Sequence, residues 1–166
     1  MTEHTHHDVD TEATARVHEL IKDQHTAMLT NRNAQGQLVS RPMATQQTEF
    51  DGDVWLFAED GSEKVRELQA DPRVNLAYTR QGAWVSLSGT ADIVHDPAKN
   101  RELWNDFAQA WFQCEPEDPK VVLIRVHSES AEYWDSPGKA ATLFSMVKAR
   151  VTGQRPDVGD NDTVDL

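Results

Sequence analysis

The 166-residue sequence contains a single cysteine, Cys114, so the chain forms no internal disulfide and no cysteine-cluster metal site. We interpret Cys114 as an unreactive free thiol. No apolar run approaches the roughly 20 residues of a membrane-spanning helix, and the N-terminal residues lack the basic-then-apolar pattern of a signal peptide. We therefore expect a soluble cytoplasmic protein without a membrane partner.

Basic residues are scarce as well. The sequence has 16 Lys and Arg against 28 Asp and Glu, which gives a formal net charge of -12 at pH 7. A protein that binds a nucleic-acid backbone needs a basic surface, so we expect no nucleic-acid partner. A small phosphate-bearing ligand remains compatible with this charge, provided that a local basic pocket reverses the field.

The common catalytic motifs are also missing. There is no GxGxxG and no GxxxxGKS/T, which argues against the usual dinucleotide and triphosphate folds, and there is no GxSxG or HExxH. His4, His6 and His7 form a cluster that could bind a metal, but their polar, acidic surroundings favour a disordered tail. The other histidines are scattered without metal-ligand spacing. The sequence thus assigns no metal site and no catalytic residue.

The composition divides the chain into one ordered domain, residues 11–152, and two tails, residues 1–10 and 153–166. Both tails are polar and acidic, which is typical of disorder. Hydrophobic residues make up 38% of the chain, a low value for a compact domain, but the shortfall lies in the tails. The middle of the chain can therefore bury a core.

The central residues predict many short strands and few helices. Apolar residues recur at helical spacing over 13–21 and predict a first amphipathic helix. Further helices are expected from Ser62, after Asp96-Pro97 and over 140–150. Antiparallel strands with a few short helices indicate a mainly β protein, a small β-barrel decorated with helices. The predicted strands cover 27–30, 38–45, a hairpin of 48–50 with 54–58, then 74–78, 83–94 and 121–126, the last continued around 132–134.

The stretch from Gly61 to Leu68 is the most informative local signal. Ser62 is a favourable N-cap, because its hydroxyl can accept from a free N–H of the first helical turn. A helix start is a natural anion site, since unpaired N–H groups and the positive end of the dipole point outward, and Lys64 adds a full positive charge. An ordinary capped surface helix with a solvated lysine explains the same residues and is the more common case.

Two strands carry further candidate binding residues. Arg41 precedes Pro42, and a proline is tolerated at a strand edge, so Arg41 either reaches an anionic ligand or lies on the surface of an edge strand. Trp84 shares one strand face with Ser86 and Ser88. That face suits a ligand or a subunit contact, and equally a solvent face with one exposed aromatic.

The helix expected after Asp96-Pro97 carries Trp104, Phe107 and Trp111 at spacings of three and four, so these side chains should share a face. Core packing is the more common role of such a face. The alternative is an anchor for a second subunit, because large aromatic side chains are typical of interfaces.

Taken in order, these segments resemble the pyridoxamine 5'-phosphate oxidase-like FMN-binding split barrels and, within them, the general stress protein 26 group. The similarity runs from about residue 16 to residue 144. Each element is weak by itself, but the ordered set is specific. The elements are Leu38-Val39-Ser40-Arg41-Pro42-Met43, Val54-Trp55-Leu56-Phe57, Ser62-Glu63-Lys64-Val65, Asp71-Pro72-Arg73-Val74-Asn75-Leu76-Ala77-Tyr78, Trp84-Val85-Ser86-Leu87-Ser88-Gly89 and Ala131-Glu132-Tyr133-Trp134-Asp135.

The resemblance implies a six-stranded antiparallel split β-barrel that works as a homodimer, with two FMN molecules at the dimer interface. By position, Arg41 and Lys64 would hold the FMN phosphate, with Ser62 beside them. The other implied cofactor contacts are Pro42 and Met43 against the flavin ring or ribityl chain, Phe57 and Ala58 through their backbone, Trp84, Trp111, and Trp134 from the second subunit.

Two departures from the oxidases bear on activity. The Arg-Leu-His-Asp-Arg stretch that grips pyridoxamine phosphate is replaced here by residues 136–144, in which Lys139 is the remaining charge. One lysine does not replace bidentate arginine contacts. Glu63 stands where the oxidases keep a second phosphate arginine, which should weaken FMN binding.

The expected function is therefore that of a general stress protein that binds FMN, or FAD, without pyridoxamine oxidase activity. The alternative is an FMN-dependent oxidoreductase or flavin reductase acting on an unknown small molecule, in which FMN carries the chemistry and the protein positions it. A cleft for haem or a deazaflavin is less well supported, because no histidine is placed as an axial ligand.

Overall fold

The structure is a computed structural model that describes residues 11–80, 82–135 and 160–166. The predicted tail 1–10, the predicted helix over 140–150 and the stretch 136–144 that replaces the oxidase motif all lie outside the described residues.

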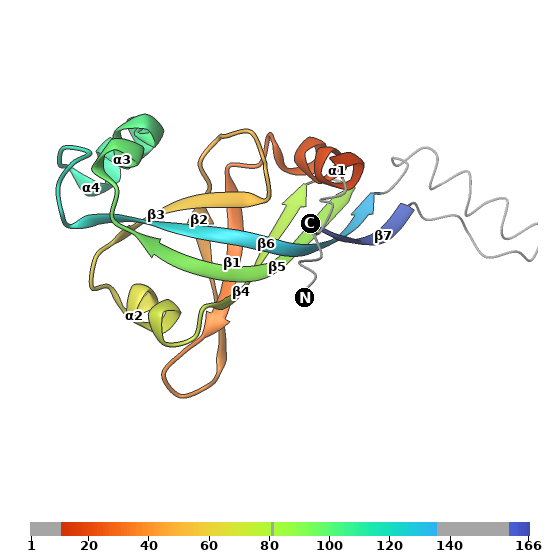
Figure 1. The fold of residues 1–166 in the computed structure, drawn as a ribbon, viewed down its shortest axis with the longest axis horizontal. Helices are drawn as coiled ribbons and strands as arrows, with labels where there is room; N and C mark the ends of the chain where they lie inside the picture. Colours follow the sequence, from red (N-terminus) through yellow and green to blue (C-terminus); the bar gives the residue numbers. More distant parts are fainter. Residues whose placement is uncertain (1–10, 81, 136–159) are drawn as a thin grey trace, which may run out of the picture.

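Within the described residues, seven strands form one antiparallel sheet (Figure 1). Their hydrogen-bonded order is β2-β1-β4-β5-β6-β3, and β7 pairs with β6. This confirms the mainly β, antiparallel architecture, with one strand more than the six expected. The strands are β1 (Thr26–Arg32), β2 (Leu38–Ala44), β3 (Asp53–Glu59), β4 (Arg73–Arg80), β5 (Ala83–Val94), β6 (Val121–Asp135) and β7 (Asp160–Asp165).

The two ends of this strand order meet and close the sheet into a barrel. Thr45, just after β2, forms an isolated antiparallel bridge with Leu56 of β3. The backbone N–H of Gln46 donates to the carbonyl of Trp55 at 3.0 Å. An isolated bridge in place of a continuous ladder leaves the barrel split between β2 and β3.

The core lies inside the barrel and is built by strand alternation. Leu29, Leu76 and Leu87 lie directly opposite one another on β1, β4 and β5, and all three are fully buried. Val65 and Leu68 of α2 (Glu63–Ala70) pack into the same cluster. Burying each of these side chains contributes roughly 1.5–3 kcal/mol, so the barrel and α2 are stabilised together.

Three more helices surround the barrel. α1 (Thr11–Ile21) buries its apolar face in the main core, as its sequence predicts. α3 (Pro97–Leu103) and α4 (Asp106–Phe112) lie together at the end of the β5–β6 ribbon that is opposite α1 and β7 (Figure 1). No helix in the described part of the chain is long and apolar enough to span a membrane.

The prediction of a single helix after Asp96-Pro97 is wrong, because the chain forms two short helices there. Asp96 caps α3 as expected, its carboxylate accepting from the N–H groups of Ala98 and Lys99 at 3.0 Å. Asn105 then caps α4, since its side-chain oxygen accepts from the N–H of Ala108 at 2.9 Å. An N-cap residue starts a new helix and does not continue the old one.

The predicted hairpin of residues 48–50 with 54–58 is also wrong. β3 pairs with β6, from Asp53 opposite His127 to Glu59 opposite Val121. Residues 48–50 form no strand. The N–H of Phe50 donates instead to Nδ1 of His18 on α1 at 3.1 Å, so this segment is held by a helix and not by a neighbouring strand.

Part of the tail predicted to be disordered over 153–166 forms a strand. Residues 160–165 form β7, which pairs with residues 130–135 of β6, whereas 153–159 lie outside the described residues. β3 covers β6 no further than residue 127, so the rest of that edge has free backbone groups, which β7 satisfies. These bonds come from the backbone, which is why an acidic, polar composition did not reveal them.

Candidate functional site

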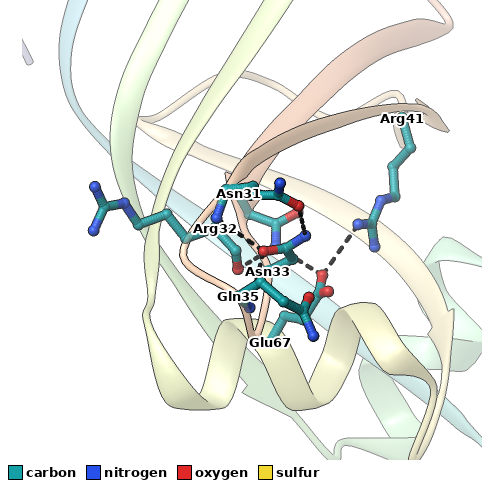
Figure 2. A network of polar contacts seen from close by, with 7 residues as sticks. Asn31, Arg32, Asn33, Gln35, Arg41 and Glu67 are labelled. Atoms are coloured by element: carbon teal, nitrogen blue, oxygen red, sulfur yellow. Dashed lines mark hydrogen bonds and ion pairs between the residues drawn. The ribbon is translucent and has the colours of Figure 1, made fainter.

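Arg41 lies on β2 and reaches toward α2 (Figure 2). Its Nη2 donates to Oε2 of Glu67 at 3.1 Å, and the two side chains are 28% and 5% exposed. The edge position of β2 beside Pro42 agrees with the sequence, because a residue without an N–H is tolerated there. Arg41 is therefore neither a free surface arginine nor a buried one. It is a half-exposed cation held by a buried carboxylate.

Glu67 is the residue at this site that the sequence did not single out. Nδ2 of the buried Asn31 also donates to Glu67 Oε2, at 2.9 Å. The hydrogen bond from Asn31 and then the contact with Arg41 hold the pKa of the Glu67 carboxyl below its ordinary value. A usable signal was present: Glu67 follows Lys64 by three positions, so the two share a helix face.

Lys64 lies beside Arg41 at the start of α2. Burial lowers the pKa of the half-buried Lys64 ammonium below its ordinary value, and the positive charge of Arg41 lowers it further, whereas Glu59 opposes the shift. The hydrogen bond from Arg41 to Glu67, three positions after Lys64 on α2, brings Arg41 to the turn of the helix that carries Lys64. That the two cations hold a phosphate together stays a prediction.

Ser62 occupies the N-cap position of α2, but its hydroxyl does not cap the helix, so that part of the prediction is wrong. Its Oγ is buried and has no hydrogen-bond partner among residues 11–80, 82–135 and 160–166. A buried hydroxyl without a partner costs free energy unless a ligand or water satisfies it. We call Arg41, Ser62 and Lys64 the cradle. Glu63, expected to repel an anion there, has an exposed side chain.

A second group of candidate residues lies on the exposed side of the sheet. Trp84 on β5 is directly opposite Trp134 on β6, and their side chains are 45% and 37% exposed. Met28 on β1 is 41% exposed. We call this surface the outer face; its residues are Met28, Thr30, Asn75, Ala77, Trp84, Ser86, Ser88, Glu132 and Trp134.

Small and polar side chains fill the centre of the outer face. Asn75 Nδ2 donates to the hydroxyls of Ser86 and Ser88 at 2.7 and 3.1 Å. Ala77 lies between Met28 and Ser86 in the register. Without bulky side chains in this central strip, another surface can approach the backbone closely, between the two tryptophans and Met28.

The remaining predicted contacts divide between the surface and the interior. Pro42 is exposed opposite Met28, and Met43 is partly buried against the main core. Phe57 and Ala58 are buried, so they can present their backbone to a ligand but not their side chains. The backbone role expected of both stays a prediction.

Trp104, Phe107 and Trp111 do not share one face. Trp104 packs at the end of α3 with Phe57, with ring centroids 5.3 Å apart. Phe107 and Trp111 are stacked on α4 at 6.1 Å and are 60% and 68% exposed. Trp104 therefore has the packing role. Phe107 and Trp111 are exposed and do not pack in the core.

A single chain does not gather all the expected contacts. Arg41 and Trp84 are separated by three strand spacings in the order β2-β1-β4-β5, about 14 Å, and lie on opposite sides of the sheet. Trp111 is on α4, at the other end of the β5–β6 ribbon from Trp134 (Figure 1). One chain by itself therefore does not place all of these groups around one position.

The Glu67 contacts predict a pH-dependent stability. A carboxyl whose folded-state pKa lies below its unfolded value, near 4.3, stabilises the fold above that value and loses its contribution as the pH falls through the folded pKa. We expect Glu67→Gln to lower the free energy of unfolding by about 1–3 kcal/mol at pH 7 and by progressively less below pH 4. Urea unfolding from pH 7 to pH 3.5 measures this, with the exposed Glu63→Gln as control. If the difference in free energy of unfolding between the native protein and Glu67→Gln is constant with pH, the prediction is wrong.

The fold and the cradle define a split β-barrel with a local cationic site at a helix start. A family model described as "Pyridoxamine 5'-phosphate oxidase like" matches residues 12–157. The chain therefore belongs to the pyridoxamine 5'-phosphate oxidase-like family, as the ordered segments suggested.

Known relatives support the same family. A general stress protein 26 from Jannaschia sp. CCS1 superimposes with a TM-score of 0.75 at 28% identity, covering 93% of this chain and 99% of that one. The general stress FMN/FAD binding protein from Xanthomonas citri gives 0.66 at 25% identity, covering 77% and 92%. Protein bli-3 of Neurospora crassa is 36% identical over 119 residues, 64% of this chain, and the chain spans 57% of that relative's length.

The residues of the cradle fit the phosphate of a flavin nucleotide. The unpartnered Ser62 hydroxyl, the half-exposed Arg41 and the half-buried Lys64 are all donors. A phosphate monoester is an acceptor with up to two negative charges. The chemistry of the donor set therefore matches this ligand. No group of three or more His, Cys, Asp or Glu that could hold a metal occurs among the described residues.

Proposed function

We propose that this protein binds FMN at a homodimer interface, with the FMN phosphate in the cradle, and that it has no pyridoxamine oxidase activity. The observation that carries the proposal is that Arg41 is held against α2 by Glu67, on the helix that begins with Lys64 and with the buried Ser62 hydroxyl, which has no partner in the described part of the chain. The Xanthomonas citri relative, described as FMN/FAD binding, supports it.

The outer face supports the homodimer. It combines three exposed apolar side chains with a strip of small residues, and exposed apolar patches of this kind mark interaction sites. Glu132, directly opposite Ser86 on β6, places one carboxylate on this face two residues from Trp134. The second copy would bring Trp134 toward the flavin of the first.

The protein's own part in this function is to bind and orient the cofactor. Bound FMN supplies the redox chemistry. Arg41 and Lys64 donate to its phosphate, and Phe57 and Ala58 offer backbone groups nearby. The sequence of residues 136–144 lacks the arginines that would hold an anionic vitamin substrate, which is why pyridoxamine phosphate is not the proposed substrate.

Replacing Lys64 tests the proposal. Lys64→Ala should weaken FMN binding by about 1–3 kcal/mol, because a charge-assisted contact to the phosphate is lost. Riboflavin, which has no phosphate, should bind the variant and the native protein equally. Quenching of flavin fluorescence measures both affinities.

Lys22→Ala is the matched control for this experiment. Lys22 is an exposed lysine just after α1 that pairs with Glu19 on the surface, so its loss removes the same charge away from the cradle. An FMN affinity that is unchanged in Lys64→Ala, or lowered equally in Lys22→Ala, would remove Lys64 from the site. Consumption of NADPH or NADH by the FMN-loaded protein would identify a flavin reductase in place of a carrier.

A further inference from the structure

We propose that Glu67 is the positioning residue of the phosphate site: held by Asn31, its buried carboxylate fixes the guanidinium of Arg41 beside Lys64. This inference rests on the proposed function and extends it to residues that contact no ligand. Figure 2 shows Arg41 reaching from β2 across to Glu67 on α2, with Asn31 of β1 beside it. The chain thus ties three separate elements together at one carboxylate.

Electrostatics gives the first reason for such a residue. Arg41 and Lys64 are both cations, so they repel each other. Burial lowers the pKa of Lys64 most, and the positive charge of Arg41 lowers it further. Without a compensating anion, the flexible side chain of Arg41 would move away from Lys64 into solvent. Glu67 lies three positions after Lys64 on α2 and is 7% exposed, so it holds Arg41 near Lys64 from within the protein.

The geometry of Asn31 gives the second reason. Its Nδ2 donates to Glu67 at 2.9 Å and to the backbone carbonyl of Arg32 at 3.0 Å. Both partners are acceptors, so the orientation of the amide is determined. Asn31 is 1% exposed. A fixed amide therefore holds the carboxylate, which in turn holds the guanidinium.

The hydrogen bonds of Arg41 give the third reason. Nη2 is the atom that donates to Glu67. Within 11–80, 82–135 and 160–166, neither Nε nor Nη1 of Arg41 donates to a protein group. A guanidinium is a planar fork that can bind a carboxylate with one side and a phosphate with another. Glu67 thus orients Arg41 and leaves donors for the ligand.

The test compares FMN with riboflavin in native protein, Glu67→Gln, Arg41→Ala and the double variant. Glu67→Gln keeps the shape of the side chain but removes the charge that holds Arg41. We expect FMN affinity to fall on the order of tenfold, with riboflavin affinity unchanged. In the Arg41→Ala background, Glu67→Gln should have no further effect on FMN, because it acts through Arg41.

The exposed Glu63→Gln is the matched control, since it removes the same charge from the same helix. An equal loss of FMN affinity in Glu63→Gln, tighter FMN binding in Glu67→Gln, or an undiminished effect in the Arg41→Ala background would overturn the inference while leaving flavin binding intact. If Glu67→Gln does not fold, Asn31→Ala takes its place. It should lower FMN affinity several-fold without affecting riboflavin, and an unchanged FMN affinity would overturn the inference.

A separate measurement distinguishes failure of this inference from failure of the proposed function. If the native protein binds neither flavin, the proposed function fails, and inorganic phosphate becomes the probe. Thermal unfolding with added phosphate should then show a rise in Tm for the native protein that is lost in Glu67→Gln and kept in Glu63→Gln. The same rise in all three proteins, or a rise in none, would overturn the role of Glu67.

Discussion

Gly89→Ala is expected to destabilise the protein by about 3 kcal/mol or more, a large fraction of the stability of a typical domain. Gly89 lies on β5 where the register with β6 shifts between Ser88 and Gly89. A Cβ at this position would lie 1.9 Å from the carbonyl oxygen of His127 and 3.0 Å from the Cα of Ser128. Both neighbours are backbone atoms of the central strand β6, so they cannot rotate away as a side chain would.

Gly36→Ala is the control for this prediction. Gly36 is in the turn between β1 and β2 with a φ of +78°, and no atom lies within 4 Å of the position that a Cβ would take there. Alanine at this position meets a backbone cost of about 1 kcal/mol but no steric clash. Urea unfolding of both variants measures the difference. If Gly89→Ala lowers the free energy of unfolding no more than Gly36→Ala does, the prediction is wrong and the backbone of β6 can shift to make room for the Cβ.

Met28→Lys is expected to convert the proposed dimer into a monomer. Met28 is 41% exposed on the outer face, so a lysine is solvated there in a single chain. In a two-fold dimer, each interface would bury two unpaired ammonium groups. Removing a charge from water costs several kcal/mol per ion, so the dimer dissociation constant should rise about a thousandfold or more. FMN affinity should fall with it, because each FMN site of the proposed dimer uses both copies.

Sedimentation velocity and FMN titration of the same samples measure this prediction. Ala98→Lys is the control, since it adds the same charge at an exposed position of α3. We expect it to remain dimeric and to bind FMN as the native protein does. A Met28→Lys protein that stays dimeric would place the interface elsewhere, and a monomer that still binds FMN fully would confine the flavin site to one chain.

The elements that the sequence predicted well are those whose signals are local. The run of β5, Ala83–Val94, has the predicted bounds, because alternation continues over its whole length. The partner of β3 was missed because it is β6, far along the chain. The closure of the barrel decides which distant strands pair. Residues 48–58 carry no signal for the pairing of β3 with β6, and the Asp51-Gly52 turn favours a local hairpin instead.

The residues of the site also divide into those with a local sequence signal and those without one. Arg41 is bonded to Glu67, three positions after Lys64 on α2, and the contact of Arg41 and Lys64 with FMN stays a prediction. Glu67 was missed because a glutamate in an acidic chain looks like a surface residue. Its burial depends on Asn31 of β1 and Arg41 of β2. A buried polar network arises from three elements meeting, so no single segment reveals it.

Because β3 pairs with β6, the ribosome makes β3 well before its partner strand. Asp53 and His127, which are opposite each other in this pair, are 74 residues apart. At a ribosomal rate of about 5–20 residues per second, β3 is made roughly 4–15 seconds before its partner. During that time Leu56 and Phe57, buried in the finished protein, lack the β6 side of their pairing, and the bridge from Thr45 to Leu56 is their contact with the chain already made. We expect this apolar segment to bind a chaperone while β6 is still unmade.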